Sequence, residues 1–270
     1  MSPDASFYDG TGRTVMVSGG TSGINRGIAR RFAESGAKVF VLSRSADKVA
    51  DTIAELRDLG AEADGMSADV RKAEEVEAAF ARCAALFGPI DVVISGAAGN
   101  FPAWASDISS NGFRAVMEID VLGTHHVMMA SYAHMRRPGL IVNISAAQAH
   151  KAMIGQAHVC AAKAGVDQLT RTLALEWGHE GLRINSVSPG PIEDTEGFRR
   201  VAPTPEDVAR RVATVPLRRT GHSTEVADLC LFLASDRATY ITGAVIPVDG
   251  GAAIGVAPDQ LAPSLGAPKR

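Results

Sequence analysis

Several features that mark other classes of protein are scarce or absent in this chain of 270 residues. It has only three cysteines, Cys83, Cys160 and Cys230, and no CxxC spacing. Neither a disulfide framework nor a zinc site is therefore expected, and we predict no metal site of any kind. We interpret all three cysteines as small core residues of a protein in a reducing compartment.

Targeting and membrane-spanning segments are also missing. The first residues lack a basic start followed by an apolar run, and no stretch reaches the roughly 18 apolar residues that span a bilayer. The end of the chain, Pro268-Lys269-Arg270, is not a peroxisomal address. A formal net charge of -3 offers no broad positive field to nucleic acid or to an anionic membrane. We expect a cytoplasmic protein that acts on a small molecule.

Short β-branched runs alternate with stretches that have apolar residues at helical spacing, such as Ile28, Phe32 and Ala33. This alternation is typical of an α/β protein in which a central parallel sheet is flanked by helices, a three-layer sandwich. The predicted buried strands are Thr14–Ser18, Lys38–Ser43, Asp91–Ser95, Leu140–Ser145, Arg183–Ser188 and Ala244–Val248.

No repeat and no linker divides the chain, so one domain is predicted over residues 1–270. Residues 190–214 are polar, charged and punctuated by prolines, and they interrupt the alternation of strands and helices. They form either a substrate lid or a solvated helical excursion, and composition favours neither. Residues 258–270 have the composition of a tail.

A glycine-rich turn follows the first predicted strand, and a helix begins after it. Glycine lets the backbone approach a pyrophosphate closely, while the helix N-terminus supplies N–H donors and the positive end of a dipole. The order of strand, turn and helix fits a Rossmann-type site for a dinucleotide, although a glycine-rich turn is by itself a weak signal. In this site we place Gly19, Thr21, Ser22, Gly23 and Ile24.

The end of the second strand bears on the choice between NAD and NADP. An acidic residue there would bind the ribose 2′-hydroxyl of NAD, but this chain has Ser43-Arg44-Ser45. Arg44 can offer a charge-assisted fork to a 2′-phosphate, and the serines can donate hydrogen bonds. NADP(H) is therefore the predicted cofactor. In the alternative interpretation Arg44 is a solvated residue at a strand end.

These motifs resemble those of the short-chain dehydrogenase/reductase superfamily. The turn is similar to TGxxxGIG, with Ser18 in place of Thr and Asn25 in place of the last Gly. Because Asn tolerates positive φ less freely than Gly, Asn25 is expected to alter the backbone there. Gly96-Ala97-Ala98-Gly99 stands where NNAG is usual. The resemblance implies further cofactor contacts from Asp69, Val70, Ala97, Ala98, Gly99, Lys163, Pro189, Gly190, Ile192 and Thr195.

The catalytic YxxxK motif of this superfamily is incomplete here. In relatives that reduce carbonyls, Tyr donates the proton while Lys lowers its pKa and holds the nicotinamide ribose. Lys163 is present, but Val159 stands at the Tyr position and Ala146 at that of the usual Ser. Ordinary ketone chemistry has therefore lost two of its three groups. We interpret His158, beside the Tyr position, as a packing residue.

One branch of the superfamily lacks the same Tyr, namely the peroxisomal type of 2,4-dienoyl-CoA reductase. The chain resembles it at residues 97–101 (AAGNF), 117–120 (MEID against MDID) and 190–197 (GPIEDTEG against GPIxxTEG). The resemblance implies that Asn100 holds the thioester oxygen and that Asp120 and Lys163 deliver a proton through water. In the alternative interpretation Asp120 caps the following helix and Asn100 is a turn residue.

The same resemblance implies a site for the substrate and an assembly. Arg71 matches an Arg that contacts coenzyme A, although it is otherwise a plain solvated residue at a helix start. Phe101, Ser109, Ser110 and Asn111 match positions that line the substrate site. A homotetramer is expected, with the helix over residues 161–177 in an interface because it is apolar on several sides.

The leading hypothesis is an NADPH-dependent reductase of an unsaturated acyl-CoA thioester. Two alternatives stay open at this point: a short-chain dehydrogenase/reductase for another substrate, and an NADP-binding sensor or assembly protein that has lost catalysis. Retention of Lys163 weighs against the second, although ribose binding alone would also explain this residue.

Overall fold

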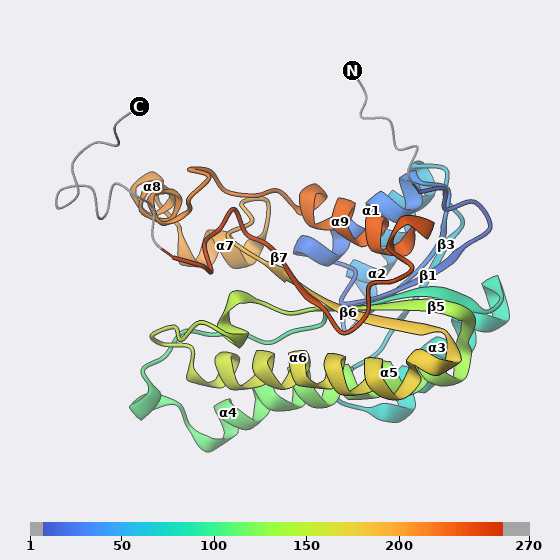
Figure 1. The fold of residues 1–270 in the computed structure, drawn as a ribbon, viewed down its shortest axis with the longest axis horizontal. Coiled ribbons are helices and arrows are strands. Elements are labelled where there is room, and N and C mark those ends of the chain that lie inside the picture. Colours follow the sequence, from blue (N-terminus) through green and yellow to red (C-terminus); the bar gives the residue numbers. More distant parts are fainter. Residues whose placement is uncertain (1–7, 256–270) are drawn as a thin grey trace.

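A seven-stranded parallel sheet forms the centre of the protein (Figure 1), which is described here by a computed structural model covering residues 8–255. The strand order is β3-β2-β1-β4-β5-β6-β7, and every pairing is parallel. The order reverses between β1 and β4, which is where open α/β sheets leave a crevice at the carboxyl ends of their strands. The predicted tail over residues 258–270 lies outside the described residues.

Six strands were predicted from the sequence, two of them with the observed bounds. The third strand, β3, was not located, because it is an edge strand without a β-branched residue. β5 begins earlier than predicted because Met135 already pairs with Ile90. The strands are β1 (Thr14–Ser18), β2 (Lys38–Ser43), β3 (Ala63–Ser67), β4 (Ile90–Ser95), β5 (Met135–Ile144), β6 (Leu182–Pro189) and β7 (Val245–Val248).

Helices cover both faces of the sheet, as Figure 1 shows, so the predicted three-layer sandwich is confirmed. The α-helices are α1 (Gly23–Glu34), α2 (Ala46–Asp58), α3 (Ala73–Phe87), α4 (Ser110–Met117), α5 (Gly123–His134), α6 (Ala157–Trp177), α7 (Glu196–Val201), α8 (Pro205–Thr214) and α9 (Ser223–Ala234). Short turns are η1 (Ala105–Asp107), η2 (Glu118–Leu122), η3 (Ala147–Ala149), η4 (Gly178–Glu180) and η5 (Asp236–Ala238).

Two apolar cores lie on opposite faces of the sheet. One contains the predicted inner face of α1, Ile28 and Phe32, together with residues of α2 and α9. The other contains Phe80 of α3 and residues of α5 and α6. The spacing of apolar residues thus predicted which helix faces are buried, since burial of that face provides most of the stability of a surface helix.

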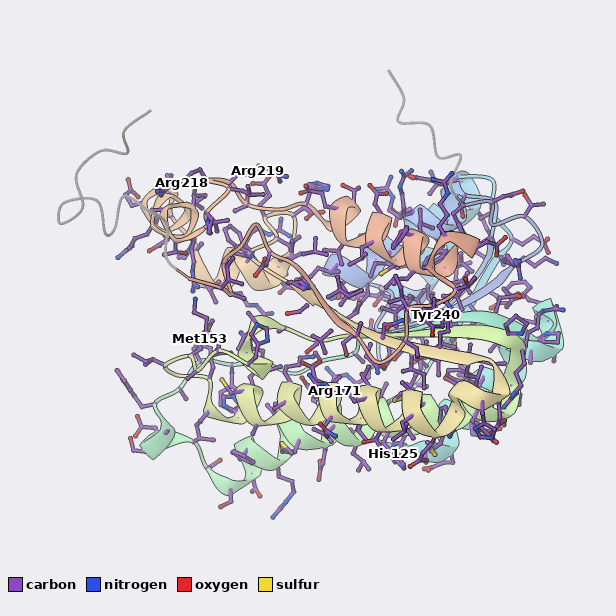
Figure 2. The ribbon with its side chains drawn as sticks, viewed as in Figure 1. His125, Met153, Arg171, Arg218, Arg219 and Tyr240 are labelled. Carbon is purple, nitrogen blue, oxygen red and sulfur yellow. The ribbon has the colours of Figure 1, made fainter. Side chains whose placement is uncertain are left out.

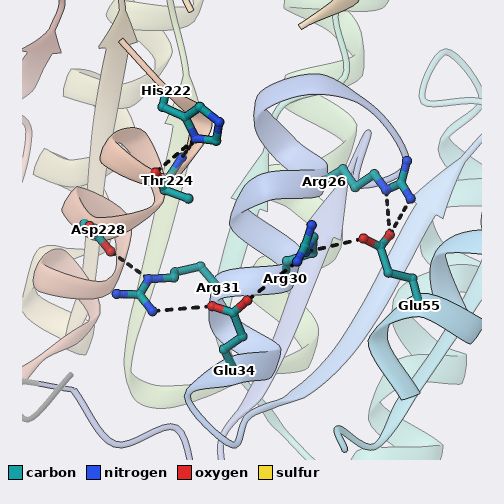
Figure 3. Close-up of polar contacts among 8 residues, drawn as sticks. All are labelled: Arg26, Arg30, Arg31, Glu34, Glu55, His222, Thr224 and Asp228. Atoms are coloured by element: carbon teal, nitrogen blue, oxygen red, sulfur yellow. Dashed lines mark hydrogen bonds and ion pairs between the residues drawn. The ribbon is translucent and has the colours of Figure 1, made fainter. Parts of the chain in front are cut away.

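Ion pairs on the outer surface join α1 to both of its neighbours (Figure 3). Glu55 of α2 contacts Arg26 at 2.6 Å and Arg30 at 3.3 Å, and Arg31 contacts Asp228 of α9 at 2.8 Å. Exposed pairs of this kind contribute at most about 1 kcal/mol each. They nevertheless connect the helix that begins at the glycine-rich turn to the elements on either side.

Two of the three cysteines are core residues, as predicted, and the third is not. Cys83 and Cys230 are fully buried, and burial raises the pKa of each thiol to about 12. Cys160 is only half-buried in the first turn of α6, so its interpretation as a core residue was wrong.

Residues 190–214 form α7 and α8, of which α8 buries no residue while α7 buries Phe198. No described helix is long and apolar enough to cross a membrane.

Candidate active site

The glycine-rich turn after β1 lies directly against the loop after β4. Gly19 has a φ of 73° and Gly23 a φ of 52°, values that a residue with a Cβ adopts only with strain. A Cβ on Gly19 would also lie 2.9 Å from the backbone of Ala97. Helix α1 begins at Gly23 without a side-chain cap, so its first N–H groups stay free for an anion.

A cavity of about 210 Å³ lies between this turn and the ends of β2 and β4. It brings together eight predicted cofactor residues: Gly19, Ser22, Ser43, Arg44, Asp69, Val70, Ala97 and Ala98. Its remaining lining residues are Leu42, Ala68, Gly96, Ile119 and Asn25, which the sequence analysis did not assign to the site. The cavity therefore offers an apolar wall, a free cation and a glycine turn, which fits the adenosine half of a dinucleotide.

Arg44 is exposed, and the described residues include no ion-pair partner for it. Thr21 Oγ1 donates a hydrogen bond to Ser43 Oγ at 2.9 Å, which connects the glycine-rich turn to the end of β2. Ser45 acts as the N-cap of α2, where its hydroxyl accepts from the Lys48 N–H at 3.4 Å. The segment 43–45 thus presents one unpaired cation beside the cavity.

The predicted cofactor contacts at residues 189–195 lie at and after the end of β6, near the glycine-rich turn. Thr195 Oγ1 donates to the Ile192 carbonyl at 2.8 Å and accepts from the Phe198 N–H as the N-cap of α7. A Cβ on Gly23 would lie 3.7 Å from the Thr195 side chain. Gly190 packs on Asp249 with no space for a Cβ, and Pro189 ends β6.

Asn25 does not alter the backbone as expected. It lies in the first turn of α1, and Arg218 is the one non-glycine residue with positive φ among residues 8–255. Instead its side chain reaches across to the loop after β4, where Nδ2 donates to the Gly96 carbonyl at 2.7 Å. The departure from the glycine usual at this position was the only sequence signal for Asn25.

Asp120 and Lys163 form a buried ion pair. Asp120 Oδ2 lies 3.2 Å from Lys163 Nζ, and the two residues are 1% and 7% exposed. Asp120 lies in η2, a π-helical turn between α4 and α5, whereas Lys163 projects from α6. π-turns inside longer helices are frequent at functional sites because they change the direction of one side chain.

The two charged groups are also tied to neighbouring strands. Asp120 Oδ1 accepts from the Gly99 N–H at 2.7 Å, and Lys163 Nζ donates to the Ile144 carbonyl at 3.1 Å. Asp120 caps no helix, since α5 begins at Gly123 without a side-chain cap, so the capping interpretation was wrong. Asn100 is exposed directly after the Gly99 that Asp120 holds. Of the three predicted catalytic residues, Asp120 and Lys163 are thus in contact, and Asn100 follows the residue whose N–H donates to Asp120.

The family's Tyr and Ser positions hold no replacement hydroxyl. Val159 is 3% exposed and packs with Val116 and Ala162. Ala146 is half-buried after β5. His158 is fully buried with its ring 4.3 Å from that of Phe101, and neither ring nitrogen has a hydrogen-bond partner among the described residues.

The predicted substrate-lining residues also cluster around the start of α4. Ser109 caps this helix by accepting from the Gly112 N–H at 3.1 Å, and Ser110 and Asn111 follow in its first turn. A Cβ on Gly112 would lie 3.0 Å from the tip of the Phe101 ring. Sequence motifs from two separate segments therefore form one surface beside Asn100.

Arg71 is not a plain solvated residue. Its guanidinium donates three hydrogen bonds to the Asp69 carboxylate, from Nε to Oδ1 and to Oδ2 at 3.0 Å each and from Nη2 to Oδ2 at 2.5 Å. These bonds lower the pKa of the Asp69 carboxyl and raise that of Arg71. A residue predicted to contact coenzyme A is thus paired with one predicted to contact the cofactor.

A family model described as enoyl-(acyl carrier protein) reductase matches residues 18–253. The chain belongs to the short-chain dehydrogenase/reductase family. It is 38% identical to a peroxisomal 2,4-dienoyl-CoA reductase of Arabidopsis thaliana over 89% of this chain and 84% of the relative. It is also 38% identical to a probable 2,4-dienoyl-CoA reductase of Bacillus subtilis, over 88% and 96%. An actinorhodin polyketide ketoreductase solved with NADPH superposes with a TM-score of 0.85, at 31% identity over 89% and 97%.

Because the chain belongs to this family, the protein is an oxidoreductase that binds a nicotinamide cofactor. The residues that fit this cofactor line the cavity of about 210 Å³ near the point where the strand order of the sheet reverses. A second cavity of about 490 Å³ lies between the end of β7 and residues 216–221. It contains none of the predicted cofactor, substrate or catalytic residues, whereas the smaller cavity contains eight of the predicted cofactor residues, so the larger volume does not make it the cofactor site.

Proposed function

We propose that this protein is an NADPH-dependent reductase of 2,4-dienoyl-CoA thioesters. The observation that carries the proposal is the buried Asp120–Lys163 pair, 3.2 Å apart, in a site where Val159 replaces the usual proton donor. A ketone reductase of this family would need the missing Tyr hydroxyl. A reductase that protonates carbon needs instead a held water and an acid–base pair to renew its proton, and Asp120 and Lys163 have that chemistry.

The residues have separate tasks in this proposal. The nicotinamide cofactor supplies the hydride, which adds at the far end of the conjugated system. Asn100 donates a hydrogen bond to the thioester oxygen, where negative charge collects in the dienolate. Asp120 and Lys163 order a water that gives its proton to carbon. The pair returns a proton to the hydroxide that is left and then recovers one from solvent. Neutralising the dienolate at carbon completes the reduction of one double bond.

Two observations support NADP(H) as the cofactor. Arg44 is exposed beside the adenosine cavity and forms no ion pair with another described residue, although, after the hydrogen bonds from Arg71, its charge also helps to lower the pKa of the Asp69 carboxyl in the same cavity. Its guanidinium is therefore open to a charge-assisted contact with a 2′-phosphate. The ketoreductase that superposes on this chain was solved with NADPH. A carboxylate at the end of β2, which would repel the phosphate, is absent from residues 43–45.

The substrate side of the proposal rests on Arg71 and the start of α4. Arg71 is 41% exposed, so one face of its guanidinium stays open to a coenzyme A phosphate while Asp69 orients it. Phe101, packed over Gly112, provides an apolar surface next to Asn100 for the acyl chain. Phe198 of α7 supports a role for residues 190–214 as a lid.

The assembly and location are further parts of the proposal. We place the chain in a homotetramer of single-domain subunits in the cytoplasm. Leu175 of α6 is 85% exposed, and Leu122 of η2 and Met129 of α5 are also exposed. These helices therefore carry exposed apolar side chains that a second copy of the chain could cover. Light scattering of the purified protein measures the mass, and a monomer would exclude this part.

The decisive experiment follows NADPH absorbance with a panel of substrates. A 2,4-dienoyl-CoA should support oxidation, whereas a saturated acyl-CoA should not. Activity confined to ketones or to other substrates would favour another short-chain dehydrogenase/reductase, and NADPH binding without oxidation would favour the non-catalytic alternative. Product NMR adds a second result, because the Arabidopsis relative is named as producing (3E)-enoyl-CoA and the Bacillus relative (2E)-enoyl-CoA.

A further inference from the structure

Asn25 fills the space between the glycine-rich turn and the loop after β4. It is 8% exposed, and its Nδ2 donates to the Gly96 carbonyl at 2.7 Å. A Cβ on Gly96 would overlap the Asn25 side-chain amide, so residue 96 has to be glycine as long as residue 25 is asparagine. Two departures from the usual family motifs are therefore a single structural feature.

The two departures are also reciprocal. The usual motifs carry Gly at the position of Asn25 and Asn at the position of Gly96, and this chain carries them the other way round. In this chain the side-chain amide of the pair projects from α1, and the residue after β4 carries no side chain. The exchange places the amide on the helix whose first turn faces the cofactor cavity.

The amide has one hydrogen-bonding atom left over. Only its NH₂ group can donate to the Gly96 carbonyl, which fixes the orientation and leaves Oδ1 as the other end. Oδ1 is buried and has no hydrogen-bond partner among the described residues. A buried acceptor without a hydrogen-bond donor lowers the stability of a protein, and most buried acceptors in proteins therefore have a donor.

The neighbours of Asn25 indicate which part of the cofactor supplies that partner. Asn25 lines the adenosine cavity together with Gly19, Arg44 and Asp69. A pyrophosphate has only acceptor atoms at neutral pH and cannot satisfy Oδ1, whereas a ribose hydroxyl can donate. Arg44 lies at the end of β2, where the 2′ substituent is read, which leaves the 3′-hydroxyl for the glycine-rich turn.

From this geometry we infer that Asn25 positions the adenine-side ribose by accepting a hydrogen bond from its 3′-hydroxyl, while Nδ2 ties α1 to the loop after β4. The inference uses the cofactor binding of the family and takes from the proposed function only the placement of Arg44. It does not depend on the acyl-CoA substrate.

Calorimetric titration of the full chain with ADP and with 3′-deoxy-ADP tests the ribose contact. The unmodified protein should bind ADP about 3- to 10-fold more tightly than 3′-deoxy-ADP, the range for one neutral hydrogen bond. Asn25→Gly should abolish this ratio. Asn25→Asp retains an acceptor and should keep the ratio while weakening both ligands, because its charge repels the phosphates. Equal affinities in the unmodified protein, or an unchanged ratio in Asn25→Gly, would overturn the inference.

Thermal melts of the ligand-free protein test the reciprocal exchange separately. Gly96→Asn should lower Tm because its side chain collides with Asn25, and the double variant Asn25→Gly with Gly96→Asn should recover most of that loss. Additive losses would reject the exchange. Neither measurement includes a thioester, so failure of the dienoyl-CoA reductase proposal would leave both results unaffected, and comparing NADPH with NADH in the Arg44→Ala variant tests the Arg44 placement independently.

Discussion

The Asp120 carboxylate and the Lys163 ammonium contact each other directly at 3.2 Å, and neither is appreciably exposed. Burying two charges costs desolvation free energy that their attraction repays only with good geometry and further hydrogen bonds. Further hydrogen bonds are present, since Gly99 donates to Asp120 Oδ1 and Lys163 donates to Ile144. Asp120 Oδ2, however, has no hydrogen-bond partner among the described residues, so its contact with Lys163 is an ion pair without hydrogen-bond geometry. A pair held in this way, beside an open cofactor cavity, is better explained by chemistry than by stability.

Asp120→Asn tests that chemistry. The amide oxygen still accepts from the Gly99 N–H, but the variant has no carboxylate to pair with Lys163. We expect turnover with a 2,4-dienoyl-CoA to fall by about 10²- to 10⁴-fold, the range for loss of an acid–base group, while NADPH still binds. The matched control is Glu118→Gln in the same π-turn, which should keep its turnover. Near-normal activity of Asp120→Asn would make the residue structural.

Arg44→Ala tests the choice of cofactor. The guanidinium is unpaired among the described residues and lies beside the adenosine cavity, so its loss should remove a charge-assisted contact worth roughly 1.5–3 kcal/mol to NADPH and little to NADH. Titrating both cofactors measures the preference, with Lys48→Ala on the following helix as the control. If the variant kept the full preference for NADPH, Arg44 would have no part in it.

Arg71→Ala separates substrate from cofactor. We expect a higher KM for a dienoyl-CoA than in the unmodified protein, and a smaller change for the matching pantetheine thioester, which lacks the nucleotide. Lys72→Ala is the neighbouring control, since the Lys72 ammonium forms an ion pair with Glu75 of α3 and no direct contact between that ammonium and the Asp69 carboxylate is found among the described residues. Because Arg71 also orients Asp69, a loss confined to NADPH affinity would reassign Arg71 to the adenosine side.

His158→Leu tests the packing interpretation of the buried imidazole. Both ring nitrogens are buried without a partner among the described residues, so an apolar side chain should leave Tm equal or higher. Turnover should stay within about twofold, because an apolar replacement that keeps the packing leaves the neighbouring site in place. Val159→Ala, which removes methyl groups from the adjacent cluster, should lower Tm and shows that the melt detects packing. A folded His158→Leu protein without activity would place the imidazole in the substrate site.

Glu225 gives the protein one acid-sensitive contact. Hydrogen bonds from Arg219 lower the pKa of this carboxyl from 4.5 to about 2. A pKa depressed in the folded state contributes stability that is complete above the unfolded value and is lost as the pH falls from 4.5 towards 2. Tm should therefore fall less steeply over this window in Glu225→Gln than in the unmodified protein, as calorimetry at several pH values can measure. Parallel profiles would contradict the lowered pKa.

Much of the fold was predictable because it is encoded locally. β-branched runs indicated β1 and β2 with their observed bounds, and the spacing of Ile28 and Phe32 identified the buried face of α1. Glycines in a strand–turn–helix order indicated the cofactor site, since positive φ and a close backbone approach are requirements of single residues. The contact between Arg71 and Asp69, by contrast, was not predicted although the two residues lie two positions apart.

The remaining features that were not predicted depend on contacts between segments that are far apart in the sequence. β3 has no β-branched residue and is a strand only because it pairs with β2 at the sheet edge. Asp120, in a π-turn between α4 and α5, reaches Lys163 of α6 only because the two helical segments pack together. In the sequence Asn25 is only a departure from the usual glycine motif. The tertiary structure shows its partner, because the carbonyl of Gly96, 71 residues later, accepts a hydrogen bond from the Asn25 amide. Sequence patterns report the conformation and burial of each segment, whereas the partner of a side chain is decided by how the segments pack together.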